Sequence, residues 1–370
     1  MNALVQSKAD TKRLELNDTK CFKMHVGGNK TLCPQLRIHN QKMLNTEQEK
    51  YLGDIVTSDA KIDKNIKMRQ DKGIGISNQI MSILKEVSFG MFHFEMGLLF
   101  RSSLLVNGIL FNTEAIHNIT DKHVTQLEEC DKSFMRQLFD AEIGTPVESF
   151  YIETSTLPIR HILMGRRIMY YHTLLRKSES ELARRVFNAQ VNFPSKSDWV
   201  SQARKDLLDC EINLTDSEIA MKSSYQFKSL VRKKIKQKSI DYLTDQQMRH
   251  SKSQFLHQNE SMKEYLKTDT LSTKQKQMLF KMRSRMCPNK TNFSNKYGGK
   301  LECSLCQDKN SKESEIHLLS CPFLVHHPKL AEELKTVKYE DIYKDLPRQI
   351  AAAKLWMNIF KIYDDENTSK

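Results

Sequence analysis

Three cysteines and a histidine near the C-terminal end have the spacing of metal ligands. Cys303 and Cys306 are separated by two residues, and ten residues later His317 and Cys321 are separated by three. This pattern places two thiolates on a tight turn, and an imidazole and a third thiolate one helical turn apart, as in tetrahedral zinc sites. Because four protein ligands leave no open coordination position, the sequence predicts a structural zinc ion (Zn2+) in a Cys3His knuckle.

Two alternatives stay open for this segment. The four residues could be unrelated members of a polar loop, since short motifs also match by chance. His326 and His327 lie near enough in the sequence to replace one of the ligands. The sequence therefore predicts a metal and leaves the fourth ligand open between His317 and these two histidines.

The positive charge of the chain is concentrated in one segment. The full sequence has 58 Lys and Arg against 45 Asp and Glu, a net charge of +13. Residues 225–300 contain 18 Lys and Arg against 5 Asp and Glu, so they carry the whole excess and the remainder is neutral. Charge gathered in this way before a zinc knuckle is typical of proteins that neutralise phosphates. The alternative is a solvated lysine-rich surface that binds nothing in particular.

Helical periodicity assigns these basic residues to particular faces. In the helix predicted from Tyr225 to Leu243, apolar residues share one arc and basic residues lie opposite. A second basic helix is predicted over 274–285, again with its basic residues facing outward. Three arginines of a helix predicted over 159–175 could either contact phosphates or pair with carboxylates. On these three helices, the candidate nucleic-acid-binding residues are Arg160, Arg166, Arg167, Lys228, Arg232, Lys233, Lys236, Lys276, Arg283 and Arg285.

The composition also excludes some classes of protein. Eight cysteines without an N-terminal apolar leader indicate a reducing, intracellular compartment, cytoplasmic and/or nuclear, and not secretion. The longest apolar run, Met96–Phe111, contains Arg101 and Asn107 and is too short to span a bilayer, so it predicts one buried helix and no membrane partner. Cys130 and Cys210 occupy apolar helical positions, which favours core thiols over nucleophiles.

The predicted fold class is mainly α, with a small β region at the N-terminus. Broken alternation and glycine turns predict two or three strands there, and from Ile62 the apolar period becomes helical. Thr120 is the expected N-cap of a helix that ends near Phe139. The predicted domains are 1–60 with the strands, 61–175 as a helical bundle, 176–300 as a connector with one short helix and then the basic region, 301–330 as the knuckle, and 331–370 as closing helices with a disordered tail from Asp364.

The order of these segments resembles the C-terminal half of reverse transcriptases from non-LTR (LINE-type) retrotransposons. The resemblance rests on Leu14–Cys21, then Lys50–Gly53, then a helical block, then Cys303–Cys321. It implies that Lys20 is the lysine of the fourth polymerase motif of the palm, and that Lys50 lies in the hairpin that grips the primer end. It further implies a thumb over 61–175, and a basic region and knuckle that help to hold RNA and target DNA.

One departure from the family concerns catalysis. Nucleotidyl transfer in this family resembles the two-metal scheme, in which aspartates hold two Mg2+ ions. Here the first Asp-Asp pair is Asp364-Asp365, in a polar tail. The resemblance therefore implies a truncated RNA-directed DNA polymerase, inactive alone and using Mg2+ only as part of a full-length parent enzyme, which could also be its partner. The alternatives are a stand-alone zinc-dependent nucleic-acid-binding protein and an inert product of a decayed transposable element.

Overall fold

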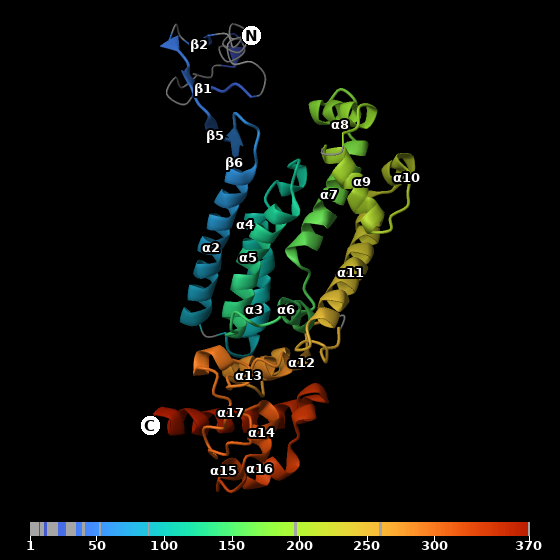
Figure 1. The fold of residues 1–370 in the computed structure, drawn as a ribbon. Helices are drawn as coiled ribbons and strands as arrows, with labels where there is room; N and C mark the ends of the chain where they lie inside the picture. Colours follow the sequence, from blue (N-terminus) through green and yellow to red (C-terminus); the bar gives the residue numbers. More distant parts are fainter. Residues whose placement is uncertain are drawn as a thin grey trace.

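The computed structural model describes residues 7, 11–12, 21–26, 35–38, 41–51, 53–87, 89–195, 198–258 and 261–368. The protein is mainly helical, with 62% helix and 5% strand, and its few small strands lie at the N-terminus, which confirms the predicted fold class. Figure 1 shows two groups of helices side by side, the first from α2 to α5 and the second from α7 to α11, with α12–α17 across one end.

The N-terminal strands are short and pair only two by two. Lys20 and most of the segment that resembles a palm motif lie outside the described residues. Lys50 is exposed on an antiparallel hairpin, opposite Ile55. The buried Arg69 forms an ion pair with Asp54, which attaches this hairpin to the first long helix. The pairs are β1 (Phe22–Lys23) with β4 (Leu44–Asn45), β2 (Arg37–Ile38) with β3 (Gln41–Lys42), and β5 (Gln48–Tyr51) with β6 (Asp54–Thr57).

The first helical group contains the bundle predicted from the helical period. Helix α5 begins after Thr120, which accepts a hydrogen bond from the backbone N–H of His123, so the predicted N-cap is confirmed. The predicted helix over 96–111 is interrupted by a π-helical turn, η4, which leaves Arg101 buried against Asp131 of α5. The elements are α2 (Asp63–Glu86), η3 (Gly90–Phe92), α3 (His93–Phe100), η4 (Arg101–Leu105), α4 (Val106–Ile109), η5 (Thr113–Ala115) and α5 (Asp121–Phe139).

The second helical group has a hydrophobic core of its own. Phe187, Trp199, Phe227 and Val231 are buried in it. The segment predicted as a connector with one short helix supplies two helices, α8 and α9, because Asp198 caps the second one by accepting the backbone N–H of Ser201. The predicted boundary at 175/176 thus falls inside this core. Helix α6 (Val147–Thr154) precedes this group, whose elements are α7 (Ile159–Leu175), α8 (Leu182–Asn192), α9 (Trp199–Asp209), α10 (Asp216–Met221) and α11 (Ser224–Arg249).

The C-terminal elements form a compact layer around one long helix, α17. Trp356 and Ile359 of this helix are fully buried, in the same core as Phe280 and Phe139. The helix continues to Thr368, so the prediction of a disordered tail from Asp364 is wrong through that residue. The elements are α12 (Glu264–Lys267), α13 (Thr273–Arg283), η6 (Ser294–Tyr297), α14 (Glu315–Ser320), α15 (Pro322–Val325), α16 (Ala331–Thr336), η7 (Tyr339–Tyr343) and α17 (Leu346–Thr368). Among the described residues, no helix combines the length and the apolar character needed to cross a membrane.

Candidate metal centre and cationic helix

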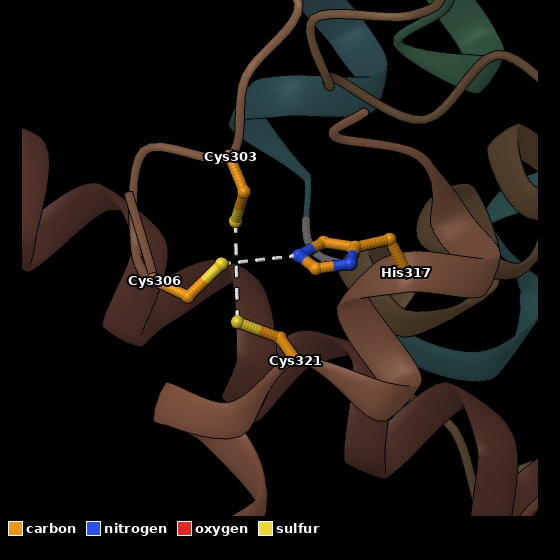
Figure 2. A group of neighbouring side chains, drawn as sticks. All are labelled: Cys303, Cys306, His317 and Cys321. Atoms are coloured by element: carbon orange, nitrogen blue, oxygen red, sulfur yellow. Dashed lines mark hydrogen bonds between the residues drawn. The ribbon is translucent and has the colours of Figure 1, made fainter. Parts of the chain in front are cut away.

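The four predicted metal ligands converge on one point. Their ligand atoms all lie within 4.8 Å of one another, and Figure 2 shows the four side chains directed at a common centre. The Sγ atoms of Cys303 and Cys321 are 3.9 Å apart, and Sγ of Cys306 lies 3.4 Å from Nε2 of His317. A tetrahedral ion with Zn–S bonds of about 2.3 Å and a Zn–N bond of about 2.0 Å requires edges of roughly 3.8 Å and 3.5 Å. The donor set therefore fits a metal ion such as zinc.

His317 is the histidine that completes this group, which resolves the choice left open by the sequence. His326 is exposed outside the group, and the half-buried His327 lies against the ring of Phe323. Within the described part of the chain, these four residues form the one cluster of three or more His, Cys, Asp or Glu that can hold a metal ion. Four protein ligands would leave a tetrahedral ion no open coordination position.

The first two ligands stand on a tight turn. Gln307 has a positive φ of 56°, and its backbone N–H donates to the carbonyl of Cys303 over 3.0 Å. This closes the turn so that the backbone N–H groups of Leu305 and Cys306 bond to the thiol of Cys303, which offsets part of the rise in its pKa that the hydrogen bond with Cys321 and burial cause. Hydrogen bonds to sulfur favour the thiolate, the form that binds metal.

The other two ligands stand at helix ends. Ser314 caps α14 and places His317 on the first turn of that helix. Cys321 lies between α14 and α15, where the backbone N–H groups of Phe323 and Leu324 bond to its sulfur. Each of the two most buried sulfurs therefore has backbone donors, as a thiolate requires away from water.

The two buried thiols also interact with each other. Their mutual hydrogen bond, together with burial, raises the pKa of Cys303 to about 12, and the same bond lowers the pKa of Cys321. Without a metal, this environment disfavours a pair of thiolates, which would repel each other. A divalent cation removes this repulsion and takes both as thiolates, so metal binding releases protons and weakens at low pH.

Glu313 is a residue of the metal centre that the sequence did not reveal. Its side chain is fully buried and accepts hydrogen bonds from the backbone N–H of Ser304, 2.9 Å away, and from the hydroxyl of Tyr363, 2.7 Å away. The backbone N–H of Lys290 donates to it as well, over 3.0 Å. The carboxylate thus joins the cysteine turn to α17. In the sequence it stands in a polar loop, where nothing distinguishes it from its exposed neighbours.

The exposed face of α11 carries the predicted basic residues. Phe227, Val231 and Ile235 are buried on the opposite face, which confirms the predicted amphipathic helix. None of the four basic residues forms an ion pair with any described residue. Lys228, Arg232 and Lys233 are exposed, and Lys236 is half-buried.

The three arginines of α7 serve mainly to join helices. Arg160 forms a two-pronged ion pair with Glu128 of α5, at 2.8 and 3.0 Å. Arg167 is buried and pairs with Asp206 of α9 at 2.8 Å. Arg166 donates to the carbonyl oxygen of Leu110 over 2.9 Å and also bonds to the side chain of Asn107. Of the two roles that the sequence left open, carboxylate pairing is the one present for Arg160 and Arg167.

The basic residues near α13 are placed differently from their prediction as an outward face. Lys276 is only 1% exposed and donates to the carbonyl of Leu266 over 2.9 Å. Arg283 is 3% exposed and holds Glu153 through two hydrogen bonds of 3.0 Å. Arg285 is half-buried, with its guanidinium 4.2 Å from the ring centre of Phe255. The outward prediction is wrong for Lys276 and Arg283, because α13 packs between the upper helices and α17 and is covered on several sides (Figure 1).

The described residues thus contain two candidate functional features. One is a closed four-ligand metal centre, and the other is a helix with four basic residues that have no ion-pair partner among the described residues. In general, a metal held by four protein ligands contributes to folding, and exposed cations attract polyanions. Comparison with protein-family models, curated proteins and solved structures finds no significant match to this chain.

Proposed function

We propose that this chain corresponds to the C-terminal half of a non-LTR retrotransposon reverse transcriptase, and that its own role is to hold RNA or DNA. The observation that carries the binding role is the face of α11, on which Lys228, Arg232, Lys233 and Lys236 have no ion-pair partner among the described residues. Unpaired cations attract phosphates and release the counterions condensed on nucleic acid, which is the main source of such affinity. The order of the sequence motifs supports the proposed assignment to this family of reverse transcriptases.

The metal centre has a supporting role in this proposal. When zinc is bound, it supplies four coordination bonds that hold α14 and the cysteine turn in place. Glu313 and Tyr363 join this unit to α17, whose core also contains Phe280 of α13. The chain's own contacts thus connect the metal centre to the helical layer below the two helical groups (Figure 1). The zinc would stabilise the fold and would take no part in a reaction.

The α11 cations are tested by a charge-neutralised variant with a matched control. The variant K228Q/R232Q/K233Q/K236Q is compared with K72Q/K85Q/K122Q/K354Q, which neutralises four exposed lysines on other helices. Binding of fluorescent RNA and DNA oligonucleotides is measured at one salt concentration. The α11 variant should lose tenfold or more of the affinity, and the control less than threefold. Equal losses would assign binding to net charge alone and contradict the role of α11.

The absence of an Asp-Asp pair before Asp364-Asp365 bears on polymerisation. These two residues belong to α17, a helix, whereas the family's aspartates stand in the sheet of the palm. We therefore expect this chain alone to synthesise no DNA. A primer-extension assay with template, dNTPs and Mg2+ tests this, and extension above that of a heat-inactivated sample would contradict it.

A further inference from the structure

A groove of about 1200 Å3 runs between α7 and α11. The two helices pack along much of their length and lie side by side in Figure 1. Residues of both helices line the groove, together with Asn107, Glu114 and the segment from Ser155 to Leu157. A smaller hollow continues it along α11 toward α6, since both are lined by Ser155, Leu157 and Lys236.

Three of the α11 cations form one edge of this groove. Lys228, Arg232 and Lys236 follow each other at intervals of four residues and all line it, whereas Lys233 does not. At 1.5 Å per helical residue, they span about 12 Å along the helix axis. From the α7 side comes Arg166, which the carbonyl of Leu110 holds in place. The groove therefore has a cationic edge that runs along the axis of α11.

The floor of the groove has the opposite character. Its lining is largely apolar, and the one carboxylate that lines it is that of Glu114, half-buried near Arg166. Four cations thus face a single acidic group, which makes the groove complementary to an anion that also carries apolar surface. The apolar lining residues are Leu157, Ile162, Gly165, Met169, Val231 and Ile235.

We propose that this groove binds a single strand of RNA or DNA, with phosphates on Lys228, Arg232 and Lys236 and bases over the apolar floor. The inference rests on the proposed function and adds the form of nucleic acid and its place. A duplex keeps its bases stacked inside and presents phosphates and sugars, which leave an apolar floor without a partner. A single strand turns its bases outward, where they cover apolar and aromatic surface while its backbone follows the cations.

The test uses the full chain loaded with zinc. Binding of a fluorescent 20-nucleotide single strand, as RNA and as DNA, is compared with binding of the duplex of the same sequence. We expect the single strands to bind at least tenfold more tightly than the duplex, and K228Q/R232Q/K236Q to lower single-strand affinity at least tenfold. With about 0.7 counterions released per contact, the slope of log affinity against log salt should become shallower by about 2. The control K72Q/K85Q/K354Q should stay within threefold.

A second pair of variants separates charge from folding. Met169 is half-buried in the groove wall, and M169E and M169K remove the same apolar contacts while adding opposite charges. The strand should bind M169K more tightly than M169E by tenfold or more, with equal melting temperatures. Equal affinities of these two variants would place the strand outside the groove and overturn the inference.

The remaining outcomes distinguish this inference from the proposed function. If duplex and single strand bind equally and K228Q/R232Q/K236Q weakens both alike, the groove inference fails and the proposed function stands. If no nucleic acid binds the unmodified chain, both fail. If an acidic amphipathic peptide binds in the groove while the labelled strand stays bound to the chain, the groove holds a protein segment. That result would also overturn the inference.

Discussion

At the scale of single residues, the metal centre makes the strongest demand on the chain. Backbone donors and the turn at Gln307 hold the sulfurs so that all four ligand atoms lie within 4.8 Å of one another. A bound cation would stabilise this arrangement, because closely spaced thiolates otherwise repel one another. The cysteines are therefore expected to bind metal when the protein is purified under reducing conditions.

Substitution of two ligands tests this expectation. C303S/C306S should reduce bound zinc from one per chain to nearly none, because serine hydroxyls are poor zinc ligands at neutral pH. C130S and C210S are suitable controls, since these thiols lie in the apolar cores away from the centre. Zinc content is measured by elemental analysis. Unchanged zinc in C303S/C306S would show that these cysteines do not hold the metal.

His161 should make stability depend on pH. The ring is 3% exposed, and burial, followed by the nearby Arg160 and Lys238, lowers its pKa to about 4. In the unfolded chain the ring has a pKa near 6.5, so the unfolded state takes up the proton first as the pH falls. The contribution of neutral His161 to the free energy of unfolding should therefore be fully present above pH 6.5. It should decrease toward pH 4, by up to about 3 kcal/mol.

H161F provides the comparison for this pH effect. Phenylalanine fills a similar space against Tyr242 and does not titrate. The free energy of unfolding of wild type should fall relative to that of H161F between pH 6.5 and pH 4, as measured by urea denaturation. Parallel pH profiles of the two proteins would show that His161 is not the group responsible.

At the scale of helices, two glycines of α2 show how packing decides the effect of a side chain. A Cβ atom on Gly73 would come 2.5 Å from Ile109, whereas a Cβ atom on Gly75 would meet nothing within 4 Å. G75A should stabilise the protein by about 1 kcal/mol through helix propensity. G73A should destabilise it by about 1–3 kcal/mol, because the helices must move apart. Equal thermal shifts for both variants would contradict the close packing of α2 on α4.

Several helices and the four metal ligands could be predicted from the sequence. Helices α5 and α7 were predictable because Thr120 and Pro158 mark their starts and one face of each is apolar. One of the two helices of 176–214 was missed because Pro194 and the polar residues up to Asp198 are typical of a connector, and the apolar residues of both helices pack on Tyr171 and Phe227 from other helices. The four metal ligands were predictable because their spacing is local.

The burial of Lys276 and Arg283 could not be predicted in this way. Each has a long apolar stem and a polar end that bonds outside α13. Lys276 reaches the carbonyl of Leu266, ten residues away, and Arg283 reaches Glu153, 130 residues away. A helix that is covered on several sides buries positions that amphipathic periodicity assigns to solvent. These partners depend on how α13 packs against the rest of the molecule, which its own sequence does not contain.

At the scale of the whole molecule, the metal centre and the helical core are one structure. Cys303, Cys321 and Leu318 share a continuous core with Trp356 of α17, while Trp199 belongs to the separate core of α7–α11. Loss of metal should therefore disturb the C-terminal layer first. The chain contains two tryptophans, one in each core, and they report on the two parts independently.

Chelation should change the fluorescence of one tryptophan and not of the other. In W199F, a strong zinc chelator should shift the emission of Trp356 to longer wavelength, because its surroundings open to water. In W356F, the emission of Trp199 should stay unchanged under the same treatment. A shift of Trp199 equal to that of Trp356 would indicate global unfolding and contradict a local effect of the metal.

If this chain holds nucleic acid through the α11 cations, which have no ion-pair partner among the described residues, its affinity for RNA and DNA must depend on salt concentration. Contacts with the three cations that line the groove predict a slope of log affinity against log salt of about −2 for a single strand, and contacts with all four cations predict about −3.6 for a duplex. Fluorescence anisotropy of the zinc-loaded, unmodified chain with labelled RNA and DNA measures this slope between 50 and 300 mM salt, roughly the range over which such contacts weaken strongly. We predict a slope of about −2 or steeper, and an affinity that does not change with salt would contradict a role of the α11 cations in binding.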